Sequence, residues 1–85
     1  MIHKSTVENY LGTMEGLAEE IGDLQYDALA TFLECLANKI QKDGDKDKGR
    51  GRIKLASHLH DCSEQLRACK SSIDKAWVIC KPHMK

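Results

Sequence analysis

The side chains of this chain best suited to metal chemistry are cysteines and histidines. His58 and Cys62 lie four residues apart, so a helix places both on one face. If the chain folds back on itself as an antiparallel hairpin, Cys35 comes near Cys62. One imidazole and two thiolates form a partial zinc shell, so Cys35, His58 and Cys62 are the candidate zinc ligands. The alternative is that Cys62 packs in a core and His58 flanks it.

A second candidate site is an acidic helix face. Several of its carboxylates lie four residues apart, and like charges at that spacing destabilise a helix unless a cation or a basic partner compensates. Magnesium prefers such oxygen ligands. The candidate magnesium ligands are Glu19, Glu20, Asp23 and Asp27.

Residues 19–24 read Glu-Glu-Ile-Gly-Asp-Leu. This run resembles the acidic helix signature of the all-α nucleoside triphosphate pyrophosphatases. The resemblance covers six residues of 85 and implies a magnesium-dependent helical dimer that handles nucleotides. The family carries a second acidic helix motif upstream, where residues 1–8 of this chain offer only Glu8.

Residues 46–54 form a local basic run in which every second residue is lysine or arginine, and such a run can contact phosphates of a nucleic acid. The chain as a whole has 13 basic and 13 acidic residues, and no aromatic side chain lies in the run to stack on a base. We therefore expect no nucleic-acid partner.

The elements that must position these residues are helices. Apolar residues recur at steps of three and four from Val7 to Ile40, and Ser5 with Glu8 has the spacing of a capping box. This pattern predicts one helix over residues 5–41. The alternative is a break at Gly22, followed by Asp23 as a new cap, which gives a three-helix bundle.

Residues 42–51 are rich in glycine and charge, so they are predicted to form the loop of an antiparallel hairpin. A second helix is predicted over residues 52–80 and ends before Pro82. Apolar or thiol side chains recur along it at alternating steps of four and three, which is typical of a packing seam in a bundle. The seam consists of Leu55, Leu59, Cys62, Leu66, Cys69, Ile73, Ala76 and Cys80.

The fold expected is an all-α single helical domain over residues 1–85, a long hairpin that dimerises into a four-helix bundle. A lone hairpin this small has little core of its own, so a homodimer or another protein partner is expected to cover it. No apolar stretch approaches a membrane span and no secretion signal is apparent, which favours a cytoplasmic location. The function expected is a small interaction or regulatory protein without catalysis and without cofactor. The alternatives are the magnesium-dependent nucleotide-handling dimer and a zinc- or thiol-binding bundle.

Overall fold

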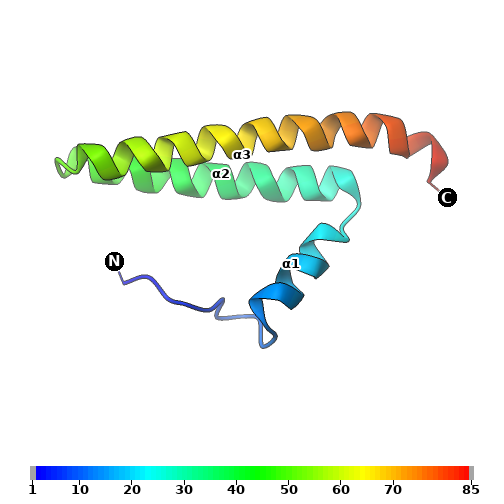
Figure 1. Ribbon diagram of the computed structural model, residues 1–85, viewed down its shortest axis with the longest axis horizontal. Coiled ribbons are helices and arrows are strands. Elements are labelled where there is room, and N and C mark those ends of the chain that lie inside the picture. The colour runs from blue at the N-terminus through cyan, green and yellow to red at the C-terminus, as the bar shows by residue number, and fades with distance from the viewer. Residues whose placement is uncertain (1, 85) are drawn as a thin grey trace.

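The protein is all-helical, as the sequence predicted. A computed structural model describes residues 2–84 and contains α1 (Met14–Gly22), α2 (Tyr26–Gly49), α3 (Ile53–Cys80) and a short 3-10 turn, η1 (Lys81–His83), with no strand among these residues. α2 and α3 lie side by side as a long antiparallel hairpin, and α1 diverges from its open end (Figure 1). No helix in the described part of the chain is long and apolar enough to cross a membrane.

Small side chains line the contact between α2 and α3. Ala30, Ala37 and Gly44 are the buried residues of α2, spaced seven apart, and Ala56 and Ser63 are those of α3 with the same spacing. Residues seven apart return to nearly the same helix face, so these residues form one line on each helix. Short side chains allow the two backbones to approach closely, and this contact holds the hairpin together.

The prediction of a loop over residues 42–51 is wrong, because α2 continues to Gly49 and only residues 50–52 connect the helices. The Lys39 ammonium donates to the Asp43 carboxylate at 2.7 Å, one helical turn further on, so the charged residues stabilise the helix. The turn itself uses Gly51, which has a positive φ of 79° that suits glycine.

The prediction of one helix over residues 5–41 is also wrong. Residues 2–13 form an irregular segment with a turn at residues 7–10, called here the N-terminal arm, and the capping box at Ser5 and Glu8 starts no helix. α1 begins instead at Met14, where the Thr13 hydroxyl accepts a hydrogen bond from the Gly16 amide at 3.0 Å.

The first helix ends at Gly22, and this break is the alternative that the sequence left open. The Asp23 amide donates to the Glu19 carbonyl at 2.9 Å and closes α1. α2 restarts at Tyr26, where the Asp27 carboxylate accepts hydrogen bonds from the Ala28 amide and the Gln25 side chain, each at 2.8 Å. α1 then leaves the hairpin instead of lying along it as a third helix of a bundle (Figure 1).

Candidate functional site

The predicted zinc ligands do not come together within one chain. The side chains of Asn38 and Arg67 meet across the hairpin, and this register places Cys35 level with Lys70, two turns from Cys62. Cys35 and Cys62 are both exposed free thiols. In residues 2–84, no three His, Cys, Asp or Glu side chains converge to hold a metal ion. The sequence pattern placed the hairpin turn too early along the chain. In the observed register, Cys35 is separated from the other two candidates.

The four candidate magnesium ligands are divided by the break between α1 and α2. Glu19 and Glu20 lie on α1, Asp23 follows the end of α1, and Asp27 lies in the first turn of α2. Asp27 is engaged at the start of its own helix, where it accepts hydrogen bonds from Gln25 and from the backbone. The continuous acidic face that the sequence predicted therefore does not form.

The predicted seam on α3 lies beside the hairpin contact and not in it. The side chains that face α2 most directly are those of Ala56 and Ser63, one residue after Leu55 and Cys62 and so about 100° further round the helix. Five of the eight seam residues are half-buried: Leu59, Leu66, Ile73, Ala76 and Cys80. The other three, Leu55, Cys62 and Cys69, are exposed in a single chain, which corrects the expectation that these thiols are buried.

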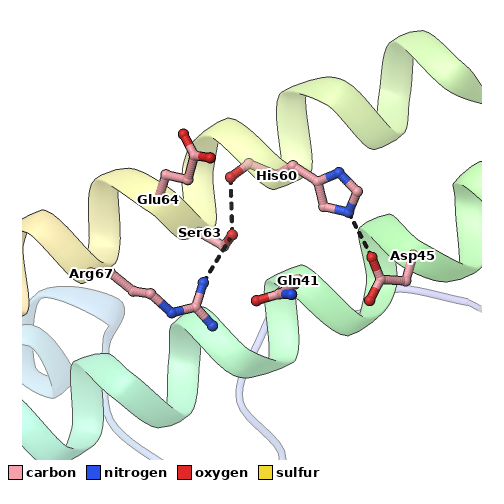
Figure 2. A pocket seen from close by; sticks show the side chains of 6 residues that line it. All are labelled: Gln41, Asp45, His60, Ser63, Glu64 and Arg67. Atoms are coloured by element: carbon pink, nitrogen blue, oxygen red, sulfur yellow. Dashed lines mark hydrogen bonds and ion pairs between the residues drawn. The ribbon is translucent and has the colours of Figure 1, made fainter.

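A polar groove of about 240 Å³ runs along one side of the α2–α3 contact (Figure 2). The His60 imidazole lies 2.9 Å from an Asp45 carboxylate oxygen, and Ser63 lies one turn along α3 from His60. These three residue types form catalytic triads in other proteins, where the imidazole activates the hydroxyl. Residue patterns alone do not bring these three together, because Asp45 falls in the loop predicted over residues 42–51.

The hydrogen bonds of this groove are structural in character. The Ser63 hydroxyl donates to the main-chain carbonyl of His60 at 2.9 Å and not to its ring, and only 2% of Ser63 is exposed. The Arg67 guanidinium donates to Asn38 at 2.9 Å and to Ser63 at 3.4 Å. Because a nucleophile must be bonded to its base and reachable by substrate, the arrangement joins two helices and does not activate Ser63.

Two ion pairs of the hairpin are local, and each shifts one pKa value. The Lys70 ammonium donates a hydrogen bond to the Asp74 carboxylate at 2.8 Å, and this bond raises the pKa of the lysine. The hydrogen bond from Lys39 lowers the pKa of the Asp43 carboxyl. The two residues of each pair lie four positions apart on the same helix. Each pair therefore favours helix formation and creates no charged site between helices.

The opposite side of the hairpin carries an apolar surface, called here the apolar face. It consists of Leu29, Leu33, Leu36 and Ile40 of α2 and the seam residues of α3. Leu36 is 36% exposed and Leu55 is 46% exposed. Contiguous apolar surface of this kind marks an interaction site more often than single exposed leucines do.

The N-terminal arm and α1 face this surface without closing on it. A hollow of about 590 Å³ lies between the arm and the hairpin and is lined by Ile40, Leu55 and Leu59 among others. A second hollow of about 420 Å³ separates Leu17 and Ile21 of α1 from the start of α2. The side chains of the arm and of α1 therefore leave empty space over the apolar face, whereas the interior of a compact domain is closely packed.

The arm is attached to α1 through Tyr10. A Cβ atom on Gly12 or on Gly16 would lie 2.7 or 2.8 Å from the Tyr10 hydroxyl, so the ring packs over both glycines. A hydrogen bond to Glu20 raises the pKa of Tyr10, with desolvation as a smaller cause. The arm and α1 thus form one unit joined to the hairpin through residues 23–25.

The dimensions of the chain show how much surface stays open. Its Cα radius of gyration is 15.4 Å, whereas a compact domain of this length has about 12 Å. Its accessible surface is 6800 Å², whereas a compact monomer of 9.5 kDa exposes about 5,000 Å². The chain therefore exposes about 1,800 Å² more than a compact monomer of its mass would.

Comparisons with family models, with curated proteins and with solved structures give no match for this chain.

Proposed function

We propose that this protein is a small, non-catalytic interaction protein that acts by assembly through its apolar face, with a homodimer as its basic unit. The observation that carries the proposal is the excess accessible surface of about 1,800 Å² over a compact monomer, together with exposed leucines on one side of the hairpin. Apolar area removed from water stabilises by about 25 cal/mol per Å², so leaving such a face open is costly.

The absence of a large core in one chain supports the same proposal. Among residues 2–84, the buried hydrophobic residues are Ala30, Ala37 and Ala56, and each buries little apolar area. A helical protein of this size needs larger buried side chains, a staple or an oligomer to outweigh chain entropy. Two hairpins packed face to face would bury Leu36, Leu66 and their neighbours in a four-helix arrangement.

A reducing compartment such as the cytoplasm is part of the proposal. Cys62 and Cys69 lie on the apolar face as exposed free thiols, and a reducing environment keeps such residues available for packing. A buried free cysteine behaves as a small hydrophobic residue, so both would become part of the assembled core.

Sedimentation equilibrium over a wide concentration range tests the proposal. The expected result is a species of twice the 9.5 kDa chain mass. Cys69→Arg places a charge on the apolar face and should yield the monomer, because a desolvated unpaired charge is costly. Ser71→Arg, on an exposed α3 position toward the polar groove, is the matched control and should remain dimeric. A monomeric unmodified protein, or equal behaviour of the two variants, would overturn the proposal.

A further inference from the structure

We infer that the partner on the apolar face is a second copy whose α3 runs antiparallel to the first, about a two-fold axis between Leu66 and Cys69. The inference rests on the proposed function and adds to it a helix pair, a direction and a register. It is argued from the spacing of the seam residues, their sizes and the exposed area.

The spacing of the seam is the same in both directions. From Leu55 to Cys80 the steps are 4, 3, 4, 3, 4, 3 and 4 residues, which is a palindrome. A two-fold axis requires that a surface fit its own copy. When α3 is reversed over its full seam, every seam position therefore meets a seam position of the partner.

The side chains in this register are complementary in size. Leu66 faces the partner's Cys69, and Cys62 faces the partner's Ile73. Leu59 faces the partner's Ala76, and Leu55 faces the partner's Cys80. Each layer thus pairs one large side chain with one small one, which keeps the spacing of the two helices uniform and fills the space between them.

Other registers lose this complementarity. A parallel pair would place each residue against its own copy, so some layers would hold two large side chains, such as Leu66, and others two small ones, such as Cys69. An antiparallel pair shifted by one heptad would place Leu55 against the partner's Ile73 and leave Ala76 and Cys80 without seam partners. Uneven layers force side chains into strained rotamers or leave voids, and both are destabilising.

The available area and the exposure of the seam agree with this partner. A stable protein interface buries about 800 Å² on each side, and the chain exposes about 1,800 Å² beyond a compact monomer. The segment that lies over Leu55 and Leu59 is the N-terminal arm. Within residues 2–84 the arm makes no hydrogen bond to the hairpin, so a second α3 can displace it.

Disulfide trapping under mild copper-phenanthroline oxidation tests the register, in a Cys35→Ser background that removes the exposed thiol of α2. The cysteines of the unmodified seam face leucine and isoleucine in the partner, so this background should stay non-covalent. Leu66→Cys should give a covalent dimer through the partner's Cys69, and Ile73→Cys should give one through the partner's Cys62. Leu55→Cys, at an already exposed position, should react with the partner's Cys80. Ser71→Cys is the control outside the seam and should not react.

Sedimentation of the same samples separates the two proposals. A protein that dimerises but forms disulfides through Cys62 or Cys69 without any added cysteine has a parallel seam, which overturns the register and leaves the proposed function intact. A dimer in which none of Leu66→Cys, Ile73→Cys and Leu55→Cys becomes covalent also overturns it. A monomer at all concentrations overturns both. Leu55→Cys keeps the test valid if the more buried substitutions unfold the chain.

Discussion

The two sides of the α2–α3 hairpin differ in what one chain can complete by itself. On the polar side, Asp45 meets His60 and Asn38 meets Arg67 across the helices, and none of the buried side-chain polar atoms of residues 2–84 lacks a partner. On the apolar side, Leu36 and Leu55 remain open to solvent. One hydrogen-bond partner is enough to satisfy a polar group, whereas an apolar surface is removed from water only when a second surface of similar area covers it. The polar side therefore stabilises the hairpin, whereas the apolar side stays partly open in a single chain.

The largest effect should come from breaking the contact that separates the two sides. Ala37→Leu adds a branched side chain at a position that is 0% exposed, where the helices leave no room. We expect a loss of about 3 kcal/mol in the free energy of unfolding, measured from the denaturant midpoint by circular dichroism. Ala28→Leu is the control, because Ala28 is exposed on the same helix. Equal midpoints for the two variants would show that this line is not packed.

A deletion on the apolar side should have the next largest effect. Leu66→Ala removes a side chain that is half-buried in one chain and becomes fully buried in the proposed dimer. We expect a loss of about 2 kcal/mol, measured by denaturant unfolding. The loss should be larger at high protein concentration, because the dimer contributes part of the stability. A loss that does not depend on concentration would place Leu66 in the hairpin contact alone.

A smaller effect should follow from filling the closest approach of the helices. A Cβ atom on Gly44 would lie 2.7 Å from the His60 ring and 3.3 Å from the Leu59 Cβ, whereas nothing lies within 4 Å of one on Gly49. Gly44→Ala should therefore destabilise by about 1 kcal/mol and shift the imidazole resonances of His60. Gly49→Ala, on the same helix, should not destabilise. If Gly44→Ala stabilises as much as an ordinary helix substitution does, the approach is looser than described.

The smallest effect concerns pH and the local ion pairs. The pKa of Asp43 is lowered in the folded chain by Lys39, so this carboxylate stabilises the fold above its unfolded pKa of 3.8. That contribution is lost as the pH falls through the folded value. Unfolding midpoints at about pH 6 and about pH 3 should differ more for the unmodified chain than for Asp43→Asn. An equal difference would show that the pair adds nothing to stability.

Part of this architecture could be predicted from residue patterns. α3 was located closely, because its apolar residues keep one period and Pro82 follows its end. The end of α2 was missed, because glycines and charges in Lys42–Gly49 resemble a loop unless the pair between Lys39 and Asp43 and the packing of Gly44 are known. The break after Gly22 was only an alternative, because the apolar period runs across it without interruption.

The candidate zinc site depended on the register of the hairpin. Cys35 was expected near Cys62 because the loop was predicted over residues 42–51, earlier along the chain than the observed connection over residues 50–52, and the position of the turn shifts every cross-helix pair. The polar residues that recur along one side of both helices are a signal that could indicate the groove around His60. That signal does not pair Asp45 with His60 unless the position of the turn is known.

The sequence by itself determined that the chain is helical and that α3 carries a continuous apolar seam, because helix period and side-chain character are local properties. Only the tertiary structure decided which faces meet. The hairpin closed on Ala37, Gly44 and Ser63 and not on the leucines, because small side chains allow the closest backbone approach and the polar pairs on one side fix the register. That choice left Leu55, Cys62 and Cys69 of the α3 seam exposed in a single chain. A simple division into apolar and polar residues does not reveal this outcome, since alanine, glycine and serine carry almost no signal in such a pattern.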